Sequence, residues 1–270
     1  AKVQKNVVVV LHNGSPVETP WANDVSAILE MYLAGEGVGE ATDALLYGEA
    51  NPSGKLAETF PIRVEDNPTY IDYATNPLHA IYSERVYVGY RYYDKKKMPV
   101  RWAFGHGLSY TTFEYSNLAL SKDAFTDGET ITVSVDVKNT GAIAGREVVQ
   151  LYVADRAGTP DRPVKELKGF GKATLEPGET KTVTMELDAR SLSYYEVRLH
   201  DFYAPTGEYE ILVGAASDDI RLTAKLHFSS TRTLLDHVDG ATTIGELLGD
   251  ARTASAVQQM MQQMASADPR

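Results

Sequence analysis

The chain of 270 residues contains no cysteine, which excludes disulfides and thiolate metal ligands. It also lacks any apolar run near the eighteen residues of a membrane span, and the apolar core of "AKVQKNVVVV" is too short for a signal peptide. Positive charge is scarce, since 26 Lys and Arg stand against 37 Asp and Glu, for a net charge of −11. Without a basic stripe, we expect neither nucleic acid nor a membrane as a partner.

The amino-terminal residues have the pattern of an α/β sheet. The run Val7–Val10 is β-branched without alternation, which predicts a strand buried on both faces. A second apolar stretch follows at 26–35, and a short helix is predicted over 39–48. We expect three residues on its buried side: Ala41, Leu45 and Leu46. Because a doubly buried strand needs neighbours, residues 1–63 are predicted to be the end of an α/β domain that starts outside this chain.

Residues 64–116 are predicted to form an ordered connector that is rich in tyrosine and proline. Seven of the sixteen tyrosines lie within 24 residues: Tyr70, Tyr73, Tyr82, Tyr87, Tyr90, Tyr92 and Tyr93. These side chains could stack on sugar rings. We favour the alternative that they wedge two domains together, with buried rings and solvated hydroxyls.

From about residue 117 the hydrophobic period becomes two, as in a half-buried strand over 131–137. Six further strands are predicted: 147–153, 165–174, 180–187, 192–199, 208–214 and 221–228. Turn sequences such as "KNTG" and "EPGE" separate them. This spacing predicts an immunoglobulin-like or fibronectin type III-like sandwich over 117–230.

Residues 231–270 are predicted to form a helical tail. Thr243 and Glu246 have the spacing of a capping box. One apolar stripe follows, made of Val257, Met260, Met261 and Met264. A helix of about twelve residues is marginal alone in water. We therefore expect the stripe to pack on its own chain, on a missing domain or on a second subunit.

The stretch "FGHGLSYTTFEYS" (104–116) has the residue types of an active site. Gly107, Ser109 and Thr111 fall one residue short of the G-x-S-x-G nucleophile elbow. That elbow also needs a helix after the serine, whereas strand-like "YTTFEYS" follows here. His106 is too close in sequence to be an obvious catalytic partner. The pattern therefore favours a structural Ser109.

Two other candidates lie in the first forty residues. His12 and Ser15 follow the predicted strand, at the edge where open α/β sheets bind ligands. A Ser-His pair is one alternative there, and we favour a loop in which Asn13 and Ser15 make local turn hydrogen bonds. The stretch "GEGVGE" (35–40) lacks G-x-G-x-x-G spacing, and its glutamates would repel a phosphate. We favour a tight turn there.

No spacing identifies a catalytic pair of carboxylates or a metal site. Glycoside hydrolysis needs two carboxyl groups facing each other across a cleft, and acidic residues are too abundant here for sequence to select two. The six histidines show no metal-ligand pattern. We predict no metal and no cofactor.

Five stretches occur together in one order: "VVVVLHNGSPVETPW" (7–21), "AGEGVGEATDALLYGEANPSGKLAETFP" (34–61), "YSERVYVGYRYYD" (82–94), "FGHGLSYTTFEYS" (104–116) and "VKNTGAIAGREVVQLYV" (137–153). In this order they resemble the carboxyl-terminal portion of glycoside hydrolase family 3, the family of many β-glucosidases. The resemblance covers roughly residues 7–228. One departure is Arg85, which stands where the family usually has glycine.

The resemblance implies three domains: a (β/α)₈-type barrel, an α/β sandwich and a fibronectin type III-like sandwich. This chain would hold the end of the second and all of the third, with 104–116 as the structural joint between them. The implied mechanism is retaining, with an aspartate of the barrel as nucleophile and a glutamate of the α/β domain as acid and base. The Ser-Asp-Trp nucleophile motif is absent from this sequence, and the glutamate would precede residue 7. We therefore assign no catalytic, cofactor-binding or metal-binding residue.

The expected function is thus that of the carboxyl-terminal part of a β-glucosidase-like hydrolase. Its expected partners are a β-glucoside or oligosaccharide substrate and an amino-terminal barrel in the same or a separate chain, with a homo-oligomer as a further option. The alternative is a non-catalytic module that binds carbohydrate or protein through an immunoglobulin-like domain.

Overall fold

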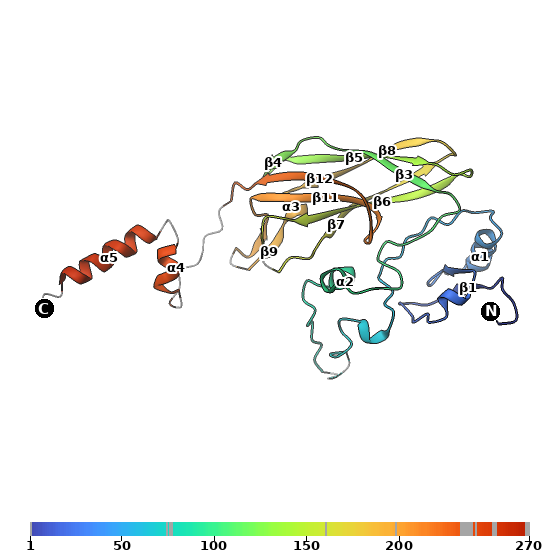
Figure 1. The fold of residues 1–270 in the computed structure, drawn as a ribbon, viewed down its shortest axis with the longest axis horizontal. Coiled ribbons are helices and arrows are strands. Elements are labelled where there is room, and N and C mark those ends of the chain that lie inside the picture. The colour runs from blue at the N-terminus through green and yellow to red at the C-terminus, as the bar shows by residue number, and fades with distance from the viewer. Residues whose placement is uncertain are drawn as a thin grey trace. The chain divides into compact units, whose positions relative to one another are not determined.

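A computed structural model describes residues 2–73, 75, 78–159, 161–197, 199–232, 240, 242–249 and 253–267 (Figure 1). Tertiary contacts divide the chain into two units. The larger comprises Ala1–Tyr195 and Phe202–Thr231, and the smaller comprises Glu196–Asp201 and Arg232–Arg270. The larger unit therefore contains both the amino-terminal segment and the strands of the sandwich.

The larger unit begins with two short parallel strands. β1 (Val8–Leu11) pairs with β2 (Ala27–Glu30), and the one-turn helix η1 (Ala22–Asp24) lies in the connection between them. The helix α1 (Val38–Leu46) follows β2. Parallel pairing with helices in the connections is the pattern of an α/β sheet. The α/β character predicted for this end of the chain is confirmed.

The burial predicted for these elements is wrong within this chain. Val8 is 47% exposed, and 9–10 are only half-buried. On α1, Ala41 and Leu46 are exposed and Leu45 is half-buried. Periodicity shows which residues are apolar, but burial also needs a covering layer. The described residues leave the faces of this two-stranded sheet largely uncovered.

The connector contains two short helices, η2 (Val64–Asp66) and α2 (Tyr90–Lys96). An isolated antiparallel bridge pairs Phe60, just before the connector, with Trp102 inside it. Phe60 N–H donates to Trp102 O (2.9 Å), and the two rings meet edge to face at 5.5 Å. The described residues between them therefore belong to a loop whose base this bridge closes.

Two facing, mostly antiparallel sheets form the sandwich (Figure 1). The five-stranded sheet has the order β4 (Ala124–Thr126), β12 (Asp219–Ser229), β11 (Gly207–Ala216), β6 (Gly145–Asp155) and β7 (Glu166–Leu175). The three-stranded sheet has the order β3 (Phe113–Leu120), β5 (Thr130–Asn139) and β8 (Thr180–Asp188). This arrangement confirms the predicted sandwich. β3 begins at Phe113, inside the segment assigned above to the connector.

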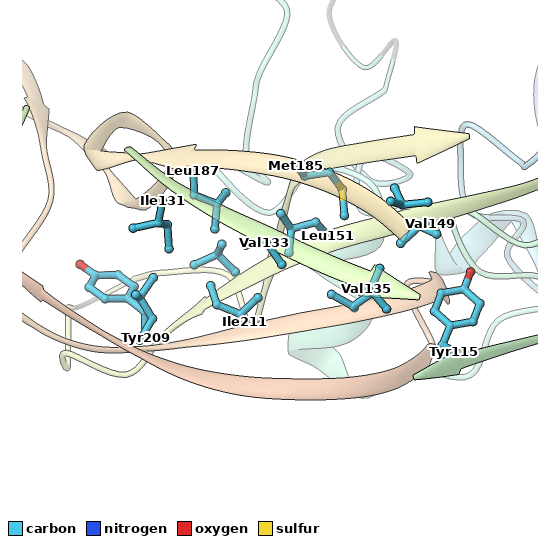
Figure 2. Close-up of a cluster of buried hydrophobic side chains, with 14 of the residues drawn as sticks. Tyr115, Ile131, Val133, Val135, Val149, Leu151, Met185, Leu187, Tyr209 and Ile211 are labelled. Atoms are coloured by element: carbon cyan, nitrogen blue, oxygen red, sulfur yellow. The ribbon is translucent and has the colours of Figure 1, made fainter. Parts of the chain in front are cut away.

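The core lies between the two sheets (Figure 2). Every second residue of β5 points into it, and four of these are fully buried: Ile131, Val133, Val135 and Val137. The facing sheet contributes Leu151 and Ile211, which are also fully buried. The period of two in the sequence is therefore the direct record of one buried face per strand.

The strand predicted at 192–199 is shorter than expected. The chain forms a one-turn helix, α3 (Ala189–Leu192), and then a short hairpin of β9 (Tyr194–Glu196) and β10 (Asp201–Tyr203). Asp188 ends β8 and caps α3, because its carboxylate accepts from Ser191 N–H (2.9 Å). The sequence signal for this break was the capping box of Asp188 and Ser191.

The smaller unit contains the helices α4 (Ile244–Gly249) and α5 (Ala254–Ala267), which contact each other. Thr253 Oγ1 donates to Leu247 O (2.6 Å) and connects the start of α5 to α4. The predicted helical tail is confirmed. The side chain of Glu246 lies outside the described residues, so its capping box with Thr243 stays a prediction.

Truncation of Leu151 tests the core. Leu151→Ala removes a fully buried side chain and should lower the free energy of unfolding by about 2–5 kcal/mol, measured by urea titration of the chain. Leu108 is 77% exposed, and Leu108→Ala should cost less than about 0.5 kcal/mol. Equal losses from the two substitutions would contradict this core.

Candidate functional site

Of the predicted joint at 104–116, residues 104–112 precede β3, and these are called the joint from here on. They lie between the loop at 51–60 and the sandwich and are hydrogen-bonded to both. Gly105 N–H donates to Leu56 O, and Leu56 N–H donates to His106 O, both at 2.8 Å. On the other side, Ser217 N–H, just after β11, donates to Phe104 O (2.9 Å). The joint is therefore bonded along its backbone to both of the parts that it connects.

Gln150 of β6 lies at the centre of the joint and is 3% exposed. Its Nε2 donates to Gly105 O (3.1 Å) and Ala215 O (2.6 Å), and its Oε1 accepts from the Tyr152 hydroxyl (2.6 Å). Gly105 has φ +83°, and a Cβ there would collide with the Gln150 amide. The glycine is thus required both by its backbone conformation and by the close approach of a buried side chain.

Ser109 takes part in a second polar contact between the joint and the loop. Its Oγ donates to Asn51 Oδ1 (2.9 Å), which also accepts from Tyr110 N–H (2.8 Å). Asn51 Nδ2 in turn donates to Ala144 O, next to β6 (3.0 Å). The hydroxyl therefore holds an asparagine in place, which favours the structural role predicted for Ser109.

His106, by contrast, lines a cavity of about 330 Å³ together with Lys55, Glu147 and Arg221. Burial lowers the pKa of His106 below its usual value near 6.5, and the positive charge of Lys55 adds to this effect. The imidazole is therefore kept neutral by its surroundings. This environment suits a packed side chain at a joint as well as a proton acceptor.

The cavity is also lined by a buried carboxylate. Glu147 is 4% exposed and accepts from the Tyr115 hydroxyl (2.8 Å), and Lys55 Nζ lies 3.5 Å from the same oxygen. Lys55 also donates to Gly107 O (3.0 Å). Burial raises the pKa of Tyr115, and the neighbouring Glu147 carboxylate raises it further. This charge network joins the loop, the joint and the sandwich, and its groups are mutually satisfied.

Tyr90 of α2 packs against the outer face of the five-stranded sheet. Tyr90 stacks on Phe104 at 4.8 Å, meets Tyr152 edge to face at 5.9 Å, and accepts from Leu167 N–H through its hydroxyl (2.7 Å). Tyr93 is 6% exposed, and its burial raises the pKa of the phenol to about 12. The contacts of Tyr90 and the burial of Tyr93 favour the wedge interpretation for these two residues.

Other members of the tyrosine cluster are not wedged. Tyr70, Tyr73 and Tyr82 are 49%, 80% and 78% exposed. The tyrosines therefore differ in burial, so the two alternatives considered from sequence can hold at different members of the cluster. Tyr90 contacts the sandwich, whereas Tyr70, Tyr73 and Tyr82 present their rings to the surface.

His12 and Ser15 are both exposed at the end of β1. Asn13 Nδ2 donates to Ser15 O (2.8 Å), which is a local turn hydrogen bond of the kind favoured from sequence. The "GEGVGE" stretch makes the turn into α1, with φ +76° at Gly35 and Gly37 at the N-cap. Glu40 lies in the first turn of that helix, where it would oppose a phosphate.

A pair of carboxylates that the sequence pattern did not reveal, Glu30 and Glu58, lies near the carboxyl end of β2. Glu30 Oε1 accepts from Tyr32 N–H (2.7 Å), and Tyr32 has a left-handed φ of +48°. Partial burial raises the pKa of Glu58, and the nearby Glu30 carboxylate raises it further. The pKa of Tyr32 rises to about 12 through burial and these two charges. The position of Glu30 at a strand end was the one sequence signal for this cluster.

Arg85 keeps the backbone geometry expected of a glycine. Its φ is +54°, in the left-handed region that favours glycine, and its side chain pairs with Asp161 at 3.7 Å on the surface. Arg85 therefore adopts a backbone conformation that glycine would adopt without strain.

Two features, a metal-binding cluster and a membrane-spanning helix, were searched for among the described residues. Within these ranges, no three His, Asp or Glu side chains are grouped so that they could hold a metal ion. Over the same part of the chain, no helix is long and apolar enough to cross a membrane.

An α/β segment joined to a fibronectin type III-like sandwich is the class of structure that these observations define. Residues 1–110 match the model of the glycosyl hydrolase family 3 C-terminal domain, and residues 147–217 match that of the fibronectin type III-like domain. The chain belongs to glycoside hydrolase family 3, in the part that carries these two domains.

Similar proteins include thermostable beta-glucosidase B of Acetivibrio thermocellus, which is 45% identical over 99% of this chain and 35% of that protein. Probable beta-glucosidase I of Aspergillus oryzae is 44% identical over 81% of this chain and 27% of that protein. The chain thus spans about a third of the length of its curated relatives, or less.

Two solved structures have the same fold. A GH3 beta-glucosidase of Bifidobacterium adolescentis has a TM-score of 0.84 and 38% identity, over 94% of this chain and 37% of that one. Beta-glucosidase 3B of Thermotoga neapolitana, in complex with α-D-glucose, has a TM-score of 0.77 and 41% identity, over 82% and 31%. Residues 1–231 are about 86% of the chain (231 of 270), so the Acetivibrio and Bifidobacterium matches extend into the tail.

Alanine substitutions at two glycines with nearly the same φ distinguish the cost of backbone strain from the cost of the collision with Gln150. Gly105→Ala adds a left-handed alanine and a collision with Gln150, whereas Gly128 has φ +84° and nothing within 4 Å of its added Cβ. We expect Gly128→Ala to cost about 1–2 kcal/mol, and Gly105→Ala to cost about 1–3 kcal/mol more. Urea unfolding of both variants measures the difference. Equal costs would mean that Gln150 does not hold the joint.

His106 should also make stability depend on pH. Because its folded-state pKa lies below the unfolded value near 6.5, the unfolded chain binds the proton first as pH falls. The free energy of unfolding should therefore fall as pH drops below about 6.5, through the folded-state pKa. In His106→Gln this part of the slope should disappear, while the slope above pH 7.5 stays the same. A variant with an unaltered slope would contradict the lowered pKa of the half-buried His106.

Proposed function

We propose that the chain is the carboxyl-terminal part of a retaining β-glucosidase-type glycoside hydrolase that releases terminal β-linked glucose or a related sugar. The observation that carries this proposal is how little of its relatives' length this chain spans. The chain is 45% identical to a β-glucosidase along 99% of its own length, yet it spans only 35% of that relative. A retaining enzyme needs a nucleophile and an acid/base, and we place both outside these 270 residues.

The exposed faces of the β1–β2 sheet support a missing partner. Parallel sheets are normally covered on both faces, whereas Val8 is 47% exposed and α1 has no buried residue. We propose that earlier strands and helices of the α/β domain cover these faces, and that a barrel domain precedes them. Both would be supplied by the same chain or by a second one.

In this proposal the chain positions the catalytic part rather than supplying it. Ligands of open α/β sheets bind at the carboxyl ends of the strands. The cluster of Glu30, Tyr32 and Glu58 lies at that end of β2. The joint and its contact with Gln150 would fix the loop that carries Glu58 relative to the sandwich. The boundaries that we propose are 1–63 for the α/β end, a connector from 64, a sandwich to 230 and a tail over 231–270. The limit between connector and sandwich moves from the predicted 116 to 112, because β3 begins at Phe113.

The reaction would proceed by double displacement. The nucleophilic carboxylate attacks the anomeric carbon while the acid protonates the departing oxygen, and water then releases the sugar with the same anomeric configuration. The two carboxyl groups of such enzymes lie about 5–5.5 Å apart. No residue of this chain is proposed for either step.

A non-catalytic binding module is the rival function. The exposed rings of Tyr70, Tyr73 and Tyr82 favour it, since flat aromatic faces suit sugar rings. The coding sequence upstream of these residues distinguishes the two. A barrel with the Ser-Asp-Trp motif supports the enzyme, and its absence supports the module.

Because both catalytic carboxyl groups are placed outside it, this chain alone is predicted not to hydrolyse an aryl β-glucoside. The complete protein should turn over at a rate typical of enzymes, about 1–10³ s⁻¹. Ser109→Ala in that protein should keep its rate within a few-fold, whereas loss of a nucleophile would cost several orders of magnitude. Turnover by the isolated chain, abolished by Ser109→Ala, would overturn the proposal.

A further inference from the structure

The helical tail presents an apolar face that the smaller unit leaves uncovered. On α5, Val257 is buried, but Met260, Met261 and Met264 are 57%, 49% and 67% exposed. Their spacing of three and four residues puts them on one side of the helix. On α4, Ile244 is 59% exposed. The two helices therefore expose apolar side chains that a globular unit would normally bury.

Two short helices cannot cover these residues by themselves. A helix of 14 residues is about 21 Å long and buries one stripe against one neighbour. A stable helical unit needs a second layer around a common core. The α4–α5 pair supplies one such layer, and its open side requires another of similar length.

The distribution of charge is compatible with a second copy of the chain as the source of that layer. The chain has a net charge of −11, so two copies repel each other over most of their surfaces. Residues 253–267 form the longest run of this sequence without Asp, Glu, Lys or Arg. A surface that contacts its own copy must avoid like charges facing each other, and this run meets that condition. The outward side of α5 carries the exposed amides of Gln258, Gln259, Gln262 and Gln263.

We propose that the α4–α5 pair of one molecule packs against the same pair of a second copy, so that the tail is a dimerisation element. Such a contact is isologous and produces a four-helix arrangement around the apolar faces of the helices. Methionine suits it, because its flexible thioether fills irregular gaps. The match to the Acetivibrio relative covers 99% of this chain and therefore includes the tail.

Paired substitutions on opposite faces of α5 test this proposal in the complete gene product that contains this chain. Met261→Lys with Met264→Lys places two charges on the apolar face. Gln259→Lys with Gln262→Lys places the same charges, at the same spacing of three residues, on the polar face. Sedimentation velocity at micromolar concentrations gives the mass of each protein. A third protein lacking residues 232–270 shows whether any dimer needs the tail.

The unaltered protein should sediment as a dimer, and so should the glutamine variant. The methionine variant should dimerise at least about 100-fold more weakly, and the shortened protein should be a monomer with an unchanged melting temperature. An unaltered protein that is monomeric at these concentrations would overturn the proposal, and so would a dimer that persists without the tail. A monomer whose melting temperature falls on removal of the tail would assign the apolar face to the rest of the same chain instead.

Discussion

The structure depends on one buried amide, that of Gln150. Its side chain reaches out of the sandwich and donates to Gly105 O and Ala215 O, so that a strand of one domain satisfies the backbone of the segment leading into it. A buried amide without partners is costly, so these bonds are strongly favoured over any displaced arrangement. The requirement for glycine at 105 follows from the same contact. The stretch that most resembles an active site is in this way explained as a joint.

A rigid joint gives the fibronectin type III-like domain a role that requires no chemistry of its own. The loop at 51–60 is bonded to the joint through Leu56 and to Ala144 through Asn51, and the buried pair of Lys55 and Glu147 adds a charged contact. These contacts would transmit the position of the sandwich to the α/β end. Catalytic geometry tolerates little displacement, so a domain that fixes a loop can matter to a reaction from which it is remote.

The sequence predicted the sandwich well, because burial of one face per strand leaves a period of two, as in β5. It predicted poorly the features that depend on contacts with residues far away in sequence or outside this chain. The apolar positions of α1 were visible, but not the absence of a layer over them. The segment 192–199 has the pattern of one strand, yet the cap at Asp188 starts a helix that ends at Leu192, and β9 then spans only Tyr194–Glu196. The cluster of Glu30 and Glu58 joins residues far apart in sequence, and only the fold brings them together.

Hydrogen exchange at the joint tests most directly whether it forms one cooperative body with the sandwich. The amides of Leu56 and Gly105 donate across the joint, and those of Leu151 and Ile211 lie in central strands of the sandwich. If the joint and the sandwich open only together, all four amides should exchange with the same opening free energy, equal to that of global unfolding. Exchange at Leu56 and Gly105 through a much smaller opening free energy than at Leu151 and Ile211 would contradict the account.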